Sequence, residues 1–204
     1  MTRPTVYVVD DDEAVADSIR MLLKSVGYDV ETFSCADDFL NIAASIKEGC
    51  LVLDVRMPGT SGLELQQQLL KRAVPIPIIF ITGHGDVPMA VQAMQAGAFD
   101  FLQKPFRDQD LLDRVAEALA RDSCRVKNSE QHEQIQEHIK LLSSREREVL
   151  DLVVQGHPNK KIAAELHLST RTIEIHRARV MEKMEAHSLA ELVRMMLVAE
   201  AAPN

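Results

Sequence analysis

Five short runs of apolar and β-branched residues alternate with segments of helical spacing through the first 120 residues, and this alternation constrains the fold most. The runs are TVYVVD, DVETF, CLVLDV, PIIFIT and FDFLQK. Between them, apolar residues recur at helical spacing, as in Val15, Ile19 and Leu22. Strands that alternate with helices form a parallel sheet covered on both faces. We therefore predict an α/β domain over residues 1–120, with a doubly wound sheet of five parallel strands.

The rest of the chain is expected to be helical. Residues 121–140 are polar and contain neither Gly nor Pro, which favours a solvated helical linker over a flexible tether. Over residues 141–204, capping residues and apolar spacing predict an all-α domain of four helices. Two short helices, KKIAAELHL and TRTIEIHRARVMEKM, are joined by a tight turn around His167. This arrangement is typical of a helix-turn-helix.

Charge is distributed unevenly along the chain. Its 204 residues have a net charge of -8, and residues 1–120 contain 10 Lys and Arg against 18 Asp and Glu. Residues 121–204 contain 13 of each kind, with a locally basic segment at 159–183. An acidic part followed by a basic segment indicates two different kinds of partner.

Nothing in the sequence predicts a membrane span or a secreted protein. No run of about 18 apolar residues is present, and the N-terminus reaches charged residues too early for a signal peptide. Cys35, Cys50 and Cys124 are odd in number and lack metal-ligand spacing. We therefore expect reduced thiols and a cytoplasmic location.

Acidic residues stand where two of the predicted strands end. Asp10, Asp11 and Asp12 follow the first strand, and Asp54 ends the third. In the order 2-1-3-4-5 of flavodoxin-like sheets these strands are neighbours, so Asp54 should face Asp10 and Asp11 at the ligand-binding edge. Oxygen ligands without His or Cys nearby select a hard ion such as Mg²⁺, which completes its shell with phosphate oxygens. We therefore predict a magnesium-dependent phosphoryl site, although Asp11 or Asp12 is also a candidate cap for the following helix.

Two more residues end strands at the same edge of the predicted sheet. Thr82 closes PIIFIT, and Lys104 closes FDFLQK. A hydroxyl and an ammonium group can both bind phosphoryl oxygens. Each alone would be an ordinary surface residue, but their joint placement supports a phosphoryl site. The chain has no Gly-rich phosphate loop, so we expect no ATP site.

Four segments, VVDDD, LVLDVRMPGTSG, FITGHGD and FDFLQKPF, resemble the signatures of a response-regulator receiver domain. The segment LSSREREVLDLVVQGHPNKKIAAELHLSTRTIEIHRARVMEKM is similar to a LuxR-type helix-turn-helix. The combination resembles the FixJ subfamily of the FixJ/NarL response regulators and covers nearly the whole chain. Glu174 departs from this pattern, because many relatives have a basic residue there. His157-Pro158 also departs from it, because a small polar residue commonly precedes Asn159.

The resemblance implies roles for the residues at the strand ends. Asp54 would be the phosphoacceptor, with Thr82 and Lys104 in contact with the phosphoryl group. The ligands of Mg²⁺ would be Asp10, Asp11, Asp54 and the backbone carbonyl of Arg56. The phosphoryl donor would be a phosphohistidine on a sensor histidine kinase.

The resemblance also implies a switch that ends in a dimer. Thr82 would move toward the phosphoryl oxygens, Phe101 would rotate inward, and a two-fold contact would form. For Phe101, ordinary packing at the sheet edge is an equal alternative. The expected dimer face comprises Phe101, Val87, Val91 and Gln95. Arg56 and His84 are placed to influence hydrolysis of the phosphoryl group, although His84 is equally well interpreted as a loop residue between two glycines. The Lys104–Pro105 bond would be cis by resemblance, whereas most such bonds are trans.

In the second predicted helix of the helix-turn-helix, Ile173, Val180 and Met184 have the spacing of core residues. Glu174, Ile175 and Ala178 form a patch on the opposite side. If this helix enters the major groove, these three are closest to the base edges, and Glu174 can accept from a cytosine amino group. The residues expected to contact phosphates are Lys160, Arg171, Thr172, Arg179 and Lys183.

The sequence therefore predicts a phosphorylation-activated transcription regulator that binds promoter DNA as a homodimer and acts with RNA polymerase. We expect no enzymatic activity beyond its own phosphorylation and dephosphorylation. One alternative is a Mg²⁺-dependent phosphatase with Asp54 as its nucleophile, but the sequence shows no dedicated general acid. Another is a regulator of RNA or of a protein. The absence of Trp and the presence of only two Tyr argue against stacking on single-stranded RNA.

Overall fold

The structure is a computed structural model that describes residues 4–83 and 87–200, without the side chain of Val87. The chain divides into two compact units, residues 1–126 and residues 127–204.

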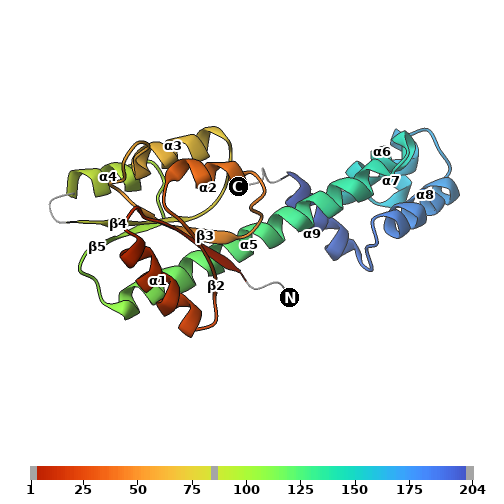
Figure 1. The fold of residues 1–204 in the computed structure, drawn as a ribbon. Coiled ribbons are helices and arrows are strands. Elements are labelled where there is room, and N and C mark those ends of the chain that lie inside the picture. Colours follow the sequence, from red (N-terminus) through yellow and green to blue (C-terminus); the bar gives the residue numbers. More distant parts are fainter. Residues whose placement is uncertain (1–3, 84–86, 201–204) are drawn as a thin grey trace. The chain divides into compact units, whose positions relative to one another are not determined.

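The first unit is built on a parallel sheet, as predicted. Its five strands have the order β2-β1-β3-β4-β5, which is the doubly wound order (Figure 1). Every residue of β3 and β4 is buried, as required of strands with helices on both sides. The strands are β1 (Thr5–Val9), β2 (Asp29–Phe33), β3 (Gly49–Asp54), β4 (Ile78–Thr82) and β5 (Asp100–Gln103).

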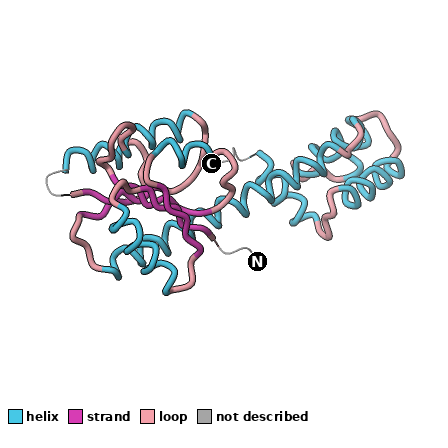
Figure 2. The backbone as a smooth tube through the Cα atoms, viewed as in Figure 1, coloured by secondary structure: helices cyan, strands magenta, loops and turns pink. Residues whose placement is uncertain are grey.

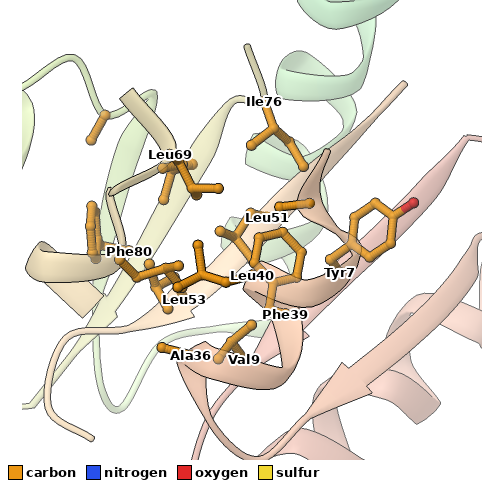
Figure 3. Close-up of a cluster of buried hydrophobic side chains, with 14 of the residues drawn as sticks. Tyr7, Val9, Ala36, Phe39, Leu40, Leu51, Leu53, Leu69, Ile76 and Phe80 are labelled. Carbon is orange, nitrogen blue, oxygen red and sulfur yellow. The ribbon is translucent and has the colours of Figure 1, made fainter. Parts of the chain in front are cut away.

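Helices cover both faces of this sheet (Figure 1). The helices α1 (Glu13–Ser25) and α5 (Asp108–Lys140) pack on one face, and α2 (Ala36–Ala43), α3 (Gly62–Lys71) and α4 (Val87–Gln95) on the other. Alternate residues of each strand point to opposite faces, so Val8 packs beneath α1 and α5 while Leu53 packs beneath α2 and α3. Figure 3 shows the second of these apolar clusters, in which Phe39 and Leu69 meet Leu51 and Phe80.

The start of α3 packs closely against Asp54 at the end of β3. Ser61 and Glu64 form a reciprocal capping box that starts α3. The first residue of that helix is Gly62, and a Cβ atom there would collide with the backbone carbonyl of Asp54. A glycine is therefore required at this position for α3 to begin against the end of β3.

Helix α5 contributes residues to both units. The buried carboxylate of Asp122 accepts hydrogen bonds from the Gly49 N–H (2.9 Å) and from Nε of Arg125 (2.8 Å). Arg125 also donates to the carbonyl of Lys47 at 3.0 Å. Farther along, Ile135 is buried in the core of the second unit. The segment 121–140, predicted as a linker, is thus helical, and its two ends belong to different units.

The second unit is helical, as predicted. Its helices after α5 are α6 (Ser144–Val154), α7 (Asn159–Glu165), α8 (Thr170–Lys183) and α9 (Leu189–Glu200), drawn as cyan tubes in Figure 2. Ser143 and Glu146 form the expected capping box of α6. The turn between α7 and α8 contains His167 at φ 55°, which is the tight turn of a helix-turn-helix.

Candidate functional site

The polar residues predicted at the strand ends gather at the carboxyl edge of the sheet. Asp10 follows β1, Asp54 ends β3, Thr82 ends β4 and Lys104 follows β5. The strand pairing places Asp54 beside Ile81 and Thr82 beside Gln103. Asp10, Asp54 and Thr82 are all buried, with 3%, 8% and 3% of their surfaces exposed. The Lys104–Pro105 peptide bond is cis, as the family resemblance implied.

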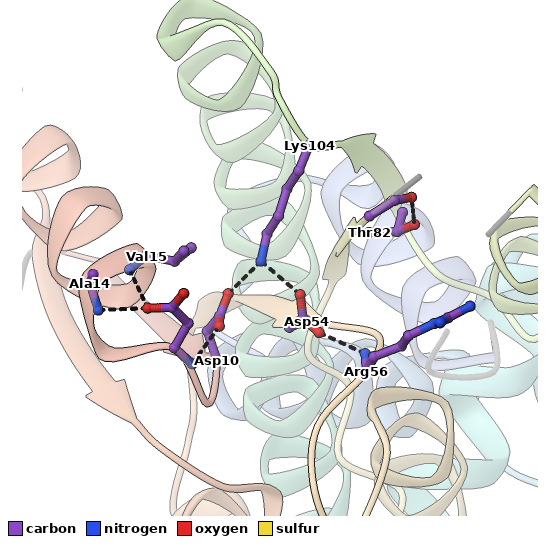
Figure 4. A network of polar contacts seen from close by, with 9 residues as sticks. Asp10, Ala14, Val15, Asp54, Arg56, Thr82 and Lys104 are labelled. Carbon is purple, nitrogen blue, oxygen red and sulfur yellow. Dashed lines mark hydrogen bonds and ion pairs between the residues drawn. The ribbon is translucent and has the colours of Figure 1, made fainter. Parts of the chain in front are cut away.

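Lys104 joins the two buried carboxylates (Figure 4). Its Nζ lies 2.9 Å from Oδ2 of Asp10 and 2.8 Å from Oδ1 of Asp54. Burial alone would lower the pKa of Lys104, but hydrogen bonds to Asp10 and Asp54 outweigh it, so the pKa is raised. The ammonium group therefore remains charged and neutralises part of the paired negative charge.

Asp54 is held at both of its oxygens. Oδ1 accepts from Lys104, and Oδ2 accepts from the backbone N–H of Arg56 at 2.6 Å. Burial raises the pKa of Asp54, and the hydrogen bond and charge of Lys104 oppose this effect only in part. Asp54 is thus an oriented carboxylate with raised basicity, which favours its use as a nucleophile.

The three consecutive aspartates have different environments. Asp10 is buried and its Oδ1 accepts from the N–H of Asp12 at 2.9 Å. Asp12 is the N-cap of α1 and accepts from the N–H groups of Ala14 and Val15, which confirms the capping alternative for this residue. Asp11 is exposed at the same edge. The run of like charges therefore comprises a buried carboxylate, an exposed carboxylate at the rim of the site and a helix cap.

The donor set of this edge fits a small hard cation. Asp10 and Asp54 supply carboxylate oxygens, and Mg²⁺ commonly takes one or two carboxylates with water and phosphate oxygens. Within residues 4–83 and 87–200, no three His, Cys, Asp or Glu side chains converge as a ready metal site. The ammonium of Lys104 instead lies between the two buried carboxylates.

Thr82 lies at the end of β4 with its hydroxyl donating to the carbonyl of Gly83 at 3.0 Å. Figure 4 shows it on the strand next to Asp54, on the side of that residue away from Asp10. Its neighbour in the predicted site, His84, lies outside the described residues. The side chain of Arg56 is exposed.

The predicted dimer face is an exposed apolar surface on α4 and β5. Val91 is 51% exposed and Phe101 is 39% exposed, while Gln95 is exposed at the end of α4. Phe101 is therefore accessible on this face in this conformation. The side chain of Val87 lies outside the described atoms. The sequence reasoning missed Met94, which is 39% exposed on α4 and belongs to the helical row that begins with Val91.

In the second unit, α8 presents the predicted polar and apolar sides. Ile173, Val180 and Met184 are buried in the core. Glu174, Ile175 and Ala178 are exposed, as predicted for residues near base edges. Arg171 is exposed and lies 3.4 Å from Glu174, so its charge partly compensates this carboxylate. Lys160 and Arg179 are exposed, and Thr172 is half-buried in the first turn beside the N-cap Ser169.

Lys183 requires a correction to its predicted role. Its Nζ donates to the buried carboxylate of Glu146 at 2.7 Å and to the carbonyl of Leu141 at 3.1 Å. This ion pair fixes the end of α8 to the start of α6. We therefore remove Lys183 from the expected phosphate contacts, because its charge is already compensated within the protein.

Comparisons with known proteins agree with both halves of this description. Residues 6–116 match the response regulator receiver domain, and residues 140–196 match the luxR family of bacterial regulatory proteins. The transcriptional regulatory protein FixJ of Rhizobium meliloti is 45% identical over 204 residues, which is all of both chains. The response regulator protein TmoT of Ectopseudomonas mendocina is 46% identical over 93% of this chain and 86% of its own.

Solved structures show the same relationship. The response regulator StyR is 47% identical, with a TM-score of 0.88 over 96% of this chain and 99% of its own. Full-length FixJ from B. japonicum is 44% identical, with a TM-score of 0.61 over 98% of each chain. No helix in the described part of this chain combines the length and apolarity of a membrane span. The chain therefore belongs to the two-component response regulators, as a FixJ-like transcriptional regulator with a receiver and a LuxR-type DNA-binding domain.

Proposed function

We propose that a sensor histidine kinase switches this regulator on by phosphorylating Asp54. The observation that carries the proposal is the buried Asp54 carboxylate, held between Nζ of Lys104 and the N–H of Arg56. In the reaction, an oxygen of Asp54 attacks the phosphorus of a phosphohistidine, and the phosphorus–nitrogen bond breaks as the new phosphorus–oxygen bond forms. Water later attacks the aspartyl phosphate and returns the free carboxylate and inorganic phosphate.

The site residues would have different roles in phosphoryl transfer. The N–H of Arg56 orients the attacking carboxylate, and Lys104 supplies a fixed positive charge for the developing negative charge on the phosphoryl oxygens. Asp10, Asp11 and Asp54, with the backbone carbonyl of Arg56, would hold Mg²⁺, which when bound neutralises charge on the phosphoryl oxygens. The hydroxyl of Thr82 would donate to a phosphoryl oxygen once the group is attached to Asp54.

We propose that the same event changes the face formed by α4 and β5. Thr82 is the last residue of β4, and the chain next enters α4. Phe101 lies on β5, paired with Phe80 on β4. A shift of Thr82 toward Asp54 would free space for Phe101 to turn inward and let Val91 and Gln95 meet a second copy in a two-fold contact.

Dimerisation would then strengthen binding to promoter DNA. The second unit has few uncompensated cations on α8, so a single copy should bind DNA weakly. Linking two copies raises affinity through effective concentration. Glu174, Ile175 and Ala178 would face base edges, while Lys160, Arg171, Thr172 and Arg179 would contact phosphates. From this position the dimer would act with RNA polymerase in the cytoplasm, where promoter DNA is found.

We propose that the protein has no enzymatic activity beyond its own phosphorylation and dephosphorylation. The raised pKa of Lys104 makes its ammonium a poor proton donor to a leaving group at neutral pH, so a small-molecule phosphatase lacks a matched general acid in this pair. Turnover of p-nitrophenyl phosphate that is lost in Asp54→Asn would contradict this proposal.

The test is DNA footprinting of the wild type and Asp54→Asn, each with and without acetyl phosphate. We expect protection to improve with acetyl phosphate in the wild type alone. Mass spectrometry of the same samples should place the added phosphoryl group on Asp54. Equal protection in all four samples, or a phosphoryl group elsewhere, would reject the proposed switch.

A further inference from the structure

Gln66 is a polar residue in the apolar layer between α3 and α4. It lies on α3 between the buried residues Leu65 and Leu69 and is only 1% exposed. Its Nε2 donates a hydrogen bond of 3.0 Å to the carbonyl of Ala93 on α4. Its Oε1 has no hydrogen-bond partner among the described residues. The two helices lie side by side on one face of the sheet (Figure 1).

The hydrogen bond from Gln66 is not needed to pair the carbonyl of Ala93. The carbonyl of Ala93 also accepts from the N–H of Ala98 at 3.0 Å, so it would remain paired without Gln66. The partnerless Oε1 is unfavourable in a buried environment, whereas an apolar side chain of the same shape has no such cost. A buried polar side chain with an unpaired oxygen therefore calls for an explanation besides packing.

The contact divides α4 into a fixed end and an end near the phosphoryl site. Ala93 is fully buried near the C-terminal end of α4. The N-terminal end of the helix follows β4, which ends at Thr82. Between these ends, Val91 is exposed on the proposed dimer face. A displacement at one end becomes a tilt of the helix only if the other end is held.

We propose that Gln66 is the positioning residue that holds the C-terminal turn of α4 to α3 and converts a shift of Thr82 into a tilt of α4. The tilt changes the orientation of Val91 and Gln95 and so prepares the face for a second copy. Without the hydrogen bond from Gln66 to Ala93, α4 shifts as a whole and tilts less. Val91 and Gln95 are then reoriented less when Asp54 is phosphorylated. The inference rests on the proposed function and adds the residue that couples phosphorylation to dimerisation.

The test is Gln66→Met, which keeps the length of the side chain and removes its donor. Dimer dissociation constants are measured by sedimentation with and without beryllofluoride, and labelling of Asp54 by acetyl phosphate is measured in parallel. We expect labelling within about twofold of the wild type and an unchanged or raised thermal midpoint. The gain in dimer affinity on adding beryllofluoride should fall by about tenfold, a typical size for coupling between sites.

Leu69→Met is the matched control, because Leu69 is equally buried on α3 and makes no polar contact with α4. It should retain the full gain in dimer affinity, even with some loss of stability. Gln66→Leu provides a second variant and should reproduce the loss seen in Gln66→Met. If either Gln66 variant gains as much dimer affinity on adding beryllofluoride as the wild type, the inference is wrong. A marked loss of thermal stability in both variants would also overturn it, because Gln66 would then have a folding role. A wild type that does not dimerise with beryllofluoride would instead count against the proposed function.

Discussion

Lys183, in the last turn of α8, donates a hydrogen bond of 2.7 Å to the buried carboxylate of Glu146 in the first turn of α6. The same carboxylate accepts from the backbone N–H of Ser143 at 2.9 Å. The carboxylate that completes the capping box of α6 therefore also anchors the end of the helix proposed to read DNA.

Glu146 should make the second unit sensitive to acid. The hydrogen bond from Lys183, followed by that from the Ser143 N–H, lowers the pKa of Glu146 from 4.5 to about 2. Because the folded-state pKa is the lower one, the stability gained from ionised Glu146 is full above pH 4.5 and is lost as pH falls toward 2. The difference in thermal midpoint between the wild type and Glu146→Gln, followed by circular dichroism, should therefore shrink over this range. Glu148→Gln, which removes an exposed pair with Arg145, is the control and should change the thermal midpoint little.

Lys183 and Arg179 should differ in their effects on protein stability and on the salt dependence of DNA binding. Lys183→Met leaves the buried carboxylate of Glu146 without its cation, so we expect a loss of about 2 kcal/mol in the free energy of unfolding. Arg179→Ala removes an exposed cation from the same helix and should be nearly neutral for stability. In fluorescence anisotropy with DNA, Arg179→Ala should reduce the salt slope by about 1, and Lys183→Met should leave it unchanged. The reverse result would restore Lys183 as a phosphate contact.

Glu174 should increase discrimination between base pairs and reduce affinity for DNA of any sequence. Its exposed carboxylate is repelled by phosphates and gains most beside a cytosine amino group. We expect Glu174→Ala to bind random-sequence DNA more tightly and to lose about 1–3 kcal/mol of preference at one base pair. Selection of binding sites from a random library, with Glu182→Ala on the same helix as control, measures both effects. An unchanged consensus would remove Glu174 from base recognition.

Asp54→Asn should stabilise the receiver at neutral pH. Burial raises the folded-state pKa of Asp54 above 3.8, so its contribution to stability is full below that value and is lost as pH rises through the folded pKa. Removing the charge should raise the thermal midpoint at pH 7, and the gain should shrink as pH falls toward 4. Asp29→Asn, at an exposed carboxylate of β2, is the matched control and should change the thermal midpoint at pH 7 little.

Phe101→Asp should uncouple phosphorylation from dimerisation. A charge on the exposed face of α4 and β5 would be buried without a partner in a two-fold contact, which is strongly unfavourable. We expect acetyl phosphate to label Asp54 as in the wild type, while sedimentation detects monomer alone. Met21→Asp introduces the same charge at a residue of α1 that is 72% exposed, and it should still dimerise. If both variants dimerise, the dimer forms through another surface.

Much of the fold and of the phosphoryl site could be predicted from the sequence. The alternation of strands and helices determines a doubly wound sheet, and this topology alone brings Asp10 and Asp54 to one edge. Capping residues can also be recognised locally, because Ser143 and Glu146 are only three positions apart.

Contacts between distant side chains could not be predicted in the same way. The periodicity of α8 places Lys183 near solvent, and only the packing of α6 against α8 reveals Glu146 beside it. Likewise, nothing in the spacing of α3 indicates that Gln66 faces a carbonyl 27 positions away. Such pairs depend on how elements pack, which a pattern of apolar residues determines only coarsely.

The hydrogen bonds that Asp122 accepts from Gly49 and Arg125 affect how regulators of this kind can be recombined. A receiver cut after Ala120 would leave the Gly49 amide at the entrance of β3 facing an empty position, although every residue of the phosphoryl site would be retained. Chimaeras that exchange DNA-binding domains should therefore be joined after Val126. Each receiver then keeps Asp122 and the hydrogen bonds that this residue accepts.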